Sequence, residues 1–240
     1  MKRAVILAGG VGSRLRPYTA VLPKPLMPVG DRPVLDIIMR QLHRDGFERV
    51  TIATGYLAEL IEVFFGDGSA YDVEIDYFRE REPLGTIGSL ASIEGLDEEP
   101  FLVMNGDILT DMSYGTFLDD HAASGAAASI ATHQRSVEIS LGVLHFESED
   151  ETLLTGYSEK PKYDYEVSMG VYCFSPVARE FIEPGVRLDF PDLILRLVAA
   201  GKAVRGWRST DYWLDLGRRE DYERAVDDFE DIRGRILPDS

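Results

Sequence analysis

The chain has 240 residues, of which 45% are hydrophobic and 28% charged, and its formal net charge at pH 7 is -17. This composition allows one sizeable core, and the negative charge argues against nucleic acid or an anionic membrane as the main partner. No apolar run has the length of a membrane span, and the apolar run after Lys2 and Arg3 is too short for a signal peptide. The single cysteine, Cys173, permits no internal disulfide, and we therefore expect a cytoplasmic protein.

The first predicted element is a short apolar strand at Arg3–Ala8, and a glycine-rich loop follows it directly. Gly9, Gly10 and Gly12 allow the backbone to turn sharply and let a ligand approach its amide groups. A P-loop would need Gly-Lys-Ser/Thr after four spacer residues, and a dinucleotide fingerprint would need a glycine where Leu15 stands. The loop therefore matches neither of these two general phosphate-binding motifs.

Basic residues gather around this loop. The first 50 residues contain nine lysines and arginines against four acidic residues, a balance that suits a small, highly charged anion. Arg14 and Arg16 supply guanidinium groups, which match phosphate oxygens bidentately. Lys24 lies between two prolines, which stiffen its backbone. A strand, a glycine turn and three cations together predict a polyphosphate cradle.

The whole stretch resembles the signature of the sugar-1-phosphate nucleotidylyltransferases (nucleoside-diphosphate-sugar pyrophosphorylases), and its pattern is most similar to the mannose-1-phosphate guanylyltransferase-like members. That signature reads Gly-Gly-x-Gly-x-Arg-Leu and then Pro-Lys-Pro-Leu, which match residues 9–15 and 23–26 here. The resemblance implies that Lys24 holds the α-phosphate of a nucleotide, while Arg14 and the loop amides hold the β- and γ-phosphates. The nucleotide-binding residues implied at this end of the chain are Leu7, Ala8, Gly9, Gly10, Gly12, Ser13, Arg14 and Lys24.

The next elements alternate between helix and strand. A helix is expected from Pro33 to Gly46, and a second helix should bury Leu57, Ile61 and Phe64. Strands are expected at residues 49–54 and 73–78. This alternation predicts an α/β fold with a parallel sheet, whose ligands bind at the carboxyl ends of the strands, where the glycine loop falls. The resemblance implies a Rossmann-like three-layer form with a mostly parallel mixed central sheet and a small acceptor-binding lobe.

Residues 80–86 correspond to the segment that reads the nucleobase in the family, which adds Glu80, Gly85 and Thr86 to the nucleotide site. An ionised carboxylate only accepts hydrogen bonds. Guanine offers two adjacent donors, whereas thymine and uracil offer an acceptor–donor–acceptor edge that a glutamine would suit better. Glu80 therefore favours GTP. The alternatives are that Glu80 is an exposed loop acid and that the base is that of dTTP, UTP or CTP.

An apolar strand at Phe101–Met104 ends in Asn105-Gly106-Asp107, which delivers the carboxylate of Asp107 into the expected ligand crevice. Magnesium favours one or two carboxylates together with phosphate oxygens and water. The Asn-Gly-Asp motif matches the family residue by residue, and the resemblance implies that Asp107 is a Mg²⁺ ligand. Asp111 is expected to cap a helix over residues 113–123.

The acceptor lobe is expected in the second half of the chain. After a strand at residues 126–132, segments 141–146 and 153–157 predict antiparallel strands, and residues 168–174 predict a further strand. The resemblance implies that Lys160 grips the sugar phosphate and that Glu159 accepts hydrogen bonds from sugar hydroxyls, with Gly142 and Ser168 also at this site. Leu141 stands where many members have an aromatic residue, and Ser168 stands where the family often has asparagine. A mannose, another hexose, a heptose or a cyclitol 1-phosphate therefore all remain open as the acceptor.

The last segments complete the match. Residues 189–192 open a helix, and Trp213, Asp215 and Gly217 resemble the family's Trp-x-Asp-x-Gly, whose aspartate is the second Mg²⁺ ligand. By sequence alone, the alternative for Asp215 is an acid at a helix N-terminus. A final amphipathic helix is expected around residues 222–229. The left-handed β-helix of hexapeptide repeats that relatives often append does not appear in the sequence.

These features predict one nucleotidyltransferase domain over residues 1–240, with 1–133 mainly binding the nucleotide and 134–240 mainly binding the sugar phosphate. The acceptor phosphate would attack the α-phosphorus of an NTP in line with departing pyrophosphate, yielding an NDP-sugar. Its expected catalytic residues are Arg14, Lys24, Asp107 and Lys160. The expected partners are an NTP and a sugar 1-phosphate, a homo-oligomer is compatible with the sequence, and the rival from another class is a non-catalytic nucleotide-sugar sensor or regulatory subunit.

Overall fold

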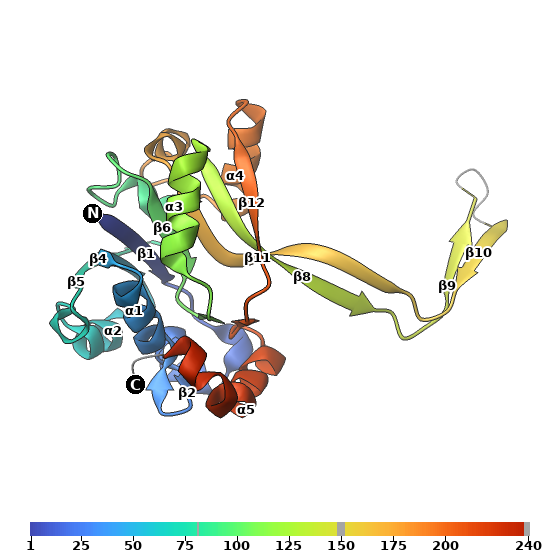
Figure 1. The fold of residues 1–240 in the computed structure, drawn as a ribbon, viewed down its shortest axis with the longest axis horizontal. Coiled ribbons are helices and arrows are strands. Elements are labelled where there is room, and N and C mark those ends of the chain that lie inside the picture. Colours follow the sequence, from blue (N-terminus) through green and yellow to red (C-terminus); the bar gives the residue numbers. More distant parts are fainter. Residues whose placement is uncertain (81, 148–151, 238–240) are drawn as a thin grey trace.

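The computed structural model describes residues 1–80, 82–147 and 152–237 (Figure 1). A seven-stranded sheet with the order β12-β8-β11-β6-β1-β4-β5 forms its centre. Its strands are β1 (Lys2–Ala8), β4 (Phe47–Thr54), β5 (Glu74–Arg79), β6 (Phe101–Asn105), β8 (Ala128–Glu138), β11 (Lys162–Phe174) and β12 (Val204–Ser209). Only β11 within this sheet runs against its neighbours, β6 and β8, so the predicted mixed and mostly parallel sheet is confirmed.

Helices lie on both faces of this sheet (Figure 1). They are α1 (Val34–Arg44), α2 (Ala58–Phe65), α3 (Tyr114–Ser124), α4 (Phe190–Ala199) and α5 (Arg219–Ile236). The buried side chains of β1 alternate between two cores, with Ile6 in the core under α1 and α3 and Val5 in the core under α4. A strand buried on both faces in this way belongs to the middle layer of a three-layer fold.

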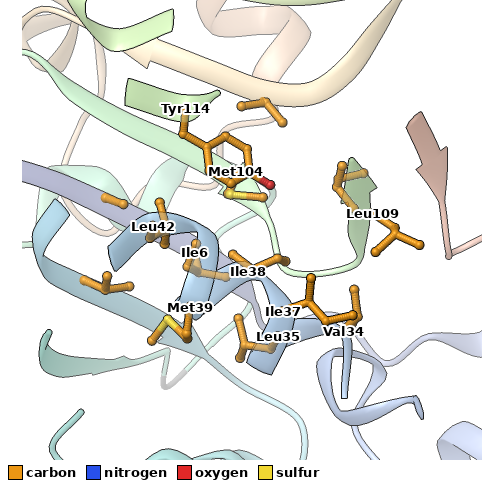
Figure 2. Close-up of a cluster of buried hydrophobic side chains, with 14 of the residues drawn as sticks. Ile6, Val34, Leu35, Ile37, Ile38, Met39, Leu42, Met104, Leu109 and Tyr114 are labelled. Atoms are coloured by element: carbon orange, nitrogen blue, oxygen red, sulfur yellow. The ribbon is translucent and has the colours of Figure 1, made fainter. Parts of the chain in front are cut away.

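Figure 2 shows the larger core between the sheet and α1. Side chains from β1, α1, β6, β7 (Ile108–Thr110) and α3 meet there, and they include Ile6, Leu35, Ile38, Leu42, Met104, Leu109 and Tyr114. Each of these side chains is almost fully buried. This packing fixes the carboxyl ends of β1 and β6 relative to one another, which matters for the site described below.

Two short antiparallel ladders lie outside the central sheet. β7 pairs with β13 (Trp213–Asp215), and β2 (Pro28–Val29) pairs with β3 (Arg32–Pro33). Among the described residues, no helix is both long enough and apolar enough to cross a bilayer.

The predicted acceptor lobe forms a long arm. β8 and β11 continue past the central sheet as a two-stranded ribbon, registered from Thr132 opposite Ser168 to Glu138 opposite Lys162. Beyond it, β9 (Val143–Phe146) pairs with β10 (Leu154–Ser158). Figure 1 shows that this part, residues 134–147 and 152–167, stands well away from the rest of the molecule, and we call it the arm.

Two sequence predictions about helices are wrong. Phe64 was expected to face the core, but it is 48% exposed whereas Phe65 is 3% exposed. Because α2 begins at Ala58, its buried stripe runs through Ala58, Ile61 and Phe65. Asp111 was expected to cap α3, but the cap is Ser113.

The side chain of Ser113 accepts a hydrogen bond of 3.2 Å from the amide of Thr116, as an N-cap residue does. Asp111 has a different task. Its carboxylate accepts a hydrogen bond of 2.8 Å from the amide of Tyr212 and pairs with Arg235 in α5. Asp111 therefore ties the segment before β13 and the C-terminal helix to the sheet.

Candidate functional site

A cavity of about 490 Å³ lies at the carboxyl ends of β1, β4, β5 and β6. This is the edge at which parallel sheets of this type bind ligands, and the volume lies within the range of small-molecule sites. The residues predicted from sequence that line it are Leu7, Ala8, Gly9, Gly10, Arg14, Lys24, Glu80, Gly85, Thr86, Asp107 and Asp215. Residues from four separate segments of the chain thus meet in one cavity.

The glycine loop is shaped by two close approaches. A Cβ added to Gly55 would come within 2.9 Å of the carbonyl oxygen of Gly9, so the loop packs directly on the backbone after β4. Gly12 has a φ of +63°, and Thr19 donates a hydrogen bond of 2.7 Å to its carbonyl oxygen. A Cβ on Gly10 would meet nothing within 4 Å, so this stretch of backbone is open to a ligand. Gly12 and the next residue, Ser13, shape the loop without lining the cavity.

Lys24 begins a short 3-10 turn, Lys24–Leu26, between two prolines. Its ammonium forms an ion pair with the carboxylate of Asp107, and its side chain is only 16% exposed. Burial lowers the pKa of this ammonium to about 8, while Asp215 opposes the shift and Arg14 adds to it. The lysine is therefore a desolvated cation aimed into the cavity.

Asp107 and Asp215 lie side by side although they are far apart in sequence. Asp215 is paired with Ile108 in the β13–β7 ladder, directly after Asp107. The amide of Leu216 donates to the carbonyl oxygen of Asp107 at 3.0 Å, and the amide of Gly217 donates to Oδ1 of Asp215 at 2.9 Å. A Cβ on Gly217 would collide with the ammonium of Lys24. The carboxylates of Asp107 and Asp215 thus both lie near the ammonium of Lys24.

Two adjacent carboxylates are a donor set that suits Mg²⁺, because this ion takes one or two carboxylates and completes its shell with phosphate oxygens and water. The described residues hold no cluster of three or more His, Cys, Asp and Glu side chains with metal-site geometry. A metal ion between Asp107 and Asp215 would therefore share its remaining ligands with a phosphate substrate rather than with further protein groups.

Glu80 follows β5, and its amide donates to the carbonyl oxygen of Thr54 at 3.0 Å. Its carboxylate lies over the glycine loop, since a Cβ on Gly9 would be 3.6 Å from Oε2. The same oxygen accepts a long hydrogen bond of 3.5 Å from the amide of Leu84. Burial raises the pKa of Glu80, and the Leu84 amide opposes this shift. Glu80 is therefore a partly desolvated acceptor beside the loop.

The loop after Glu80 is held by the segment that precedes α4. The amide of Thr86 donates a hydrogen bond of 3.0 Å to Oδ1 of Asp189, and the hydroxyl oxygen of Thr86 accepts one of 2.7 Å from the amide of Phe190. Gly85 has a φ of +79° and faces the carbonyl oxygen of Leu188. These contacts hold in place the part of the cavity wall that contains Gly85 and Thr86.

Sequence reasoning missed some lining residues. Asn105 and Gly106 belong to the Asn-Gly-Asp motif, and Ala53 lies near the end of β4 at the same edge as Ala8, so the strand-end rule could have found them. Arg187 also lines the cavity and pairs with Asp189 at 3.3 Å. No motif surrounds Arg187, so only the fold reveals it.

The predicted acceptor residues are not brought to this cavity. Gly142 precedes β9 and lies against the ring of Tyr157, while Glu159 and Lys160 lie between β10 and β11 in the arm. Tyr157 donates a hydrogen bond of 2.9 Å to the carboxylate of Glu159. Ser168 lies where the arm leaves the sheet and donates to the hydroxyl oxygen of Tyr172 at 3.2 Å. Gly142, Glu159 and Lys160 belong to the arm, which stands away from the body that contains the cavity (Figure 1).

Known proteins share both the sequence and the shape of this chain. A family model described as nucleotidyl transferase matches residues 3–232. A mannose-1-phosphate guanylyltransferase of Mycobacterium tuberculosis is 32% identical over 96% of this chain and 65% of its own length. A UTP–glucose-1-phosphate uridylyltransferase of Synechocystis is 31% identical over 93% of this chain and 62% of its own length.

Among solved structures, HddC from Yersinia pseudotuberculosis superposes with a TM-score of 0.72 at 26% identity, covering 95% of this chain and all of HddC. The chain thus spans less than two thirds of the two curated relatives but the full length of this structural neighbour. The match covers the glycine loop, Lys24 and both aspartates, which lie within the residues of the family model.

Proposed function

Because the chain belongs to the nucleotidyl transferase family, we propose that it joins a nucleoside triphosphate to a sugar 1-phosphate and releases pyrophosphate. The observation that carries this proposal is the convergence of Lys24, Asp107 and Asp215 beside an open glycine loop. A largely buried ammonium, two carboxylates and an open glycine loop are what a triphosphate and its counter-ion require.

In this reaction an oxygen of the acceptor phosphate forms a bond to the α-phosphorus, and the bond from that phosphorus to the bridging oxygen of pyrophosphate breaks. The acceptor phosphate is already a strong nucleophile, so the protein has to position the reactants and neutralise charge. Lys24 would hold the α-phosphate, where negative charge builds in the transition state. Arg14 and the amides around Gly10 would hold the β- and γ-phosphates.

Asp107 and Asp215 would hold Mg²⁺ against the phosphates. When bound, the ion supplies neutralisation of phosphate charge and polarisation of the phosphorus under attack.

For the finer specificity we propose GTP and a mannose 1-phosphate-like acceptor, with heptose and cyclitol 1-phosphates in the same class. The position of Glu80 beside the glycine loop supports a base with adjacent donors. So do the mannose-1-phosphate guanylyltransferases among the similar proteins and the crystal structure of HddC complexed with GMP-PN. The uridylyltransferase of Synechocystis supports the alternative, which is UTP with glucose 1-phosphate.

The test of the reaction is a matrix of GTP, UTP, dTTP and CTP against mannose, glucose, heptose and cyclitol 1-phosphates, read by pyrophosphate release. We expect release only when both substrates and Mg²⁺ are present, with the highest kcat/KM in the GTP column. Release without an acceptor would indicate hydrolysis instead, and a silent matrix would contradict the proposed reaction.

Replacing Glu80 with glutamine should lower the preference for GTP over UTP by about tenfold to a hundredfold, because a carboxylate that accepts from two donors becomes an amide. The readout is the ratio of the kcat/KM values for the two nucleotides. Glu82→Gln is the matched control, since it makes the same change at an exposed position of the same loop. An unchanged ratio in Glu80→Gln would remove Glu80 from base recognition.

The pKa of Lys24 sets an expectation for pH dependence. With a pKa of about 8, its ammonium loses its proton as pH rises through that value, so kcat/KM should fall there. kcat should hold to higher pH, because bound phosphates favour the charged form. In Lys24→Arg the alkaline fall should disappear, since a guanidinium stays charged. A rate profile measured from about pH 6 to about pH 10 checks this, and a flat kcat/KM in the unmodified protein would contradict it.

A further inference from the structure

The arm exposes an unusual amount of apolar surface. Of the twenty large hydrophobic side chains that are exposed among the described residues, nine lie between residues 137 and 165. They include Leu141 at 72% exposure and Tyr157 at 60%. Figure 1 shows no helix lying over this part of the chain. This many exposed apolar side chains in one segment suit it to packing on another protein surface.

A slender ribbon also lacks the means to stabilise itself. β9 and β10 form a sheet of two strands, and a two-stranded sheet without a packed face is at best marginally stable in water. The arm therefore needs a surface to pack on, and the body of its own chain does not provide one.

The base of the arm is held so that it points away from the body. Arg135 of β8 forms an ion pair of 2.8 Å with Asp221 of α5, and its guanidinium lies 4.9 Å from the ring of Trp213. The indole of Trp213 in turn donates to the carbonyl oxygen of Met169 at 2.9 Å. The β8–β11 ladder continues without interruption from Arg135 to Glu138, so the contacts of Arg135 set the direction of the arm.

The lining of the cavity has too little positive charge to balance two phosphate substrates. Its lining holds three cationic side chains, Arg14, Lys24 and Arg187, and three carboxylates, Glu80, Asp107 and Asp215. A lining with no net charge faces a triphosphate and a second phosphate dianion. One Mg²⁺ ion offsets only part of that charge, so the acceptor phosphate needs a further cation.

We propose that the arm of one copy of this chain packs on a second copy and brings its Lys160 and Glu159 to the open side of that copy's cavity, so that the active unit is a reciprocal dimer. The inference rests on the proposed function, because it takes the acceptor phosphate as the group that Lys160 meets. A two-fold axis would exchange both arms, cover both apolar surfaces and complete both cavities with one interface.

The interface is tested without any assay of activity. In sedimentation velocity the protein should be a dimer, and Leu141→Glu should shift it to a monomer by placing a charge on the apolar surface of the arm. Leu195→Glu is the matched control, because Leu195 on α4 is 67% exposed and lies outside both the arm and the lining of the cavity, so this variant should stay dimeric. A monomeric parent protein, or a dimeric Leu141→Glu, would overturn the proposal.

Delivery of Lys160 to the other copy is tested by complementation. Lys24→Met and Lys160→Met, each made alone, should lose at least about a hundredfold in kcat. A heterodimer purified through two different tags from cells that make both variants should recover about half the activity of the parent dimer, because one of its two cavities has an intact lysine and receives an intact arm. If each chain used its own arm, the heterodimer would stay as inactive as the single variants.

The outcomes separate the two proposals. Full activity of Lys160→Met, or a heterodimer that recovers nothing, overturns the exchange of arms while leaving the proposed reaction in place. A parent protein that is inactive with every substrate pair contradicts the reaction, and the sedimentation of Leu141→Glu against Leu195→Glu then decides on the interface alone.

Discussion

Replacing Lys24 with methionine should lower kcat about a thousandfold or more while leaving the fold intact. Methionine has nearly the length and the apolar character of the aliphatic part of Lys24, but it lacks the ammonium. The reaction is almost entirely a matter of positioning and charge, and the proposed contact of Lys24 with the α-phosphate is made at the atom where charge grows. A loss of this size corresponds to about 4 kcal/mol of transition-state stabilisation.

The measurement is single-turnover pyrophosphate release together with the thermal unfolding curve. Lys202→Met is the matched control, since Lys202 is an exposed lysine between α4 and β12. We expect Lys202→Met to have the parent rate and Lys24→Met to keep a single cooperative unfolding transition above the assay temperature. A Lys24→Met variant that turns over at close to the parent rate would rule out the proposed role.

The aspartate pair should give an effect of similar size. Asp107→Asn and Asp215→Asn should each reduce kcat/KM by a hundredfold to a thousandfold, because an amide oxygen is a much poorer partner for Mg²⁺ than a carboxylate. The double variant should be little worse than either single one, since both side chains would hold the same ion. Asparagine at position 215 can still accept the hydrogen bond from the Gly217 amide, so the β13 segment should keep its place.

The metal itself offers a second readout. With Mn²⁺ in place of Mg²⁺ and a non-hydrolysable nucleotide, calorimetry should show that both variants bind the metal–nucleotide complex more weakly. Asp227→Asn, at an exposed aspartate of α5, serves as the control and should bind it like the parent protein. If Asp107→Asn and Asp215→Asn bound the complex with unchanged affinity, the two carboxylates would have no part in holding a metal ion.

The parts of the fold that sequence patterns predict well are those buried on both sides. β1 and β6 are continuous apolar segments followed by glycine, and they were found close to their observed bounds. β12 was not predicted because it lies at the edge of the sheet, where Arg205, Gly206 and Arg208 break any apolar pattern. The sequence pattern also predicted Phe64 instead of Phe65 as the buried residue of α2. Two adjacent aromatic residues fit two different helical phases, and the choice between them depends on the first residue of the helix.

For the site, local motifs predicted which side chains line the cavity, but only topology explains why they meet. Nothing within the segment around Asp215 shows that it pairs with β7, which places it beside Asp107. The arm illustrates the opposite case. Glu159 and Lys160 stand in a recognisable motif, yet the motif says nothing about the direction in which a ribbon leaves its sheet, and that direction depends on Arg135, Asp221 and Trp213.

Under the proposed function, the ion pair between Lys24 and Asp107 should select the form in which the nucleotide enters the cavity. A phosphate anion without a metal ion would break the ion pair by binding Lys24, and the carboxylate of Asp107 would then repel the phosphate oxygens. A divalent cation without a phosphate would break the pair by binding Asp107, and the released ammonium of Lys24 would then repel the cation. A triphosphate already complexed with magnesium offers each of the two side chains a new partner at the same moment. The cavity should thus favour metal-complexed over free nucleotide, and departure of the metal with pyrophosphate would let the lysine and the aspartate pair again.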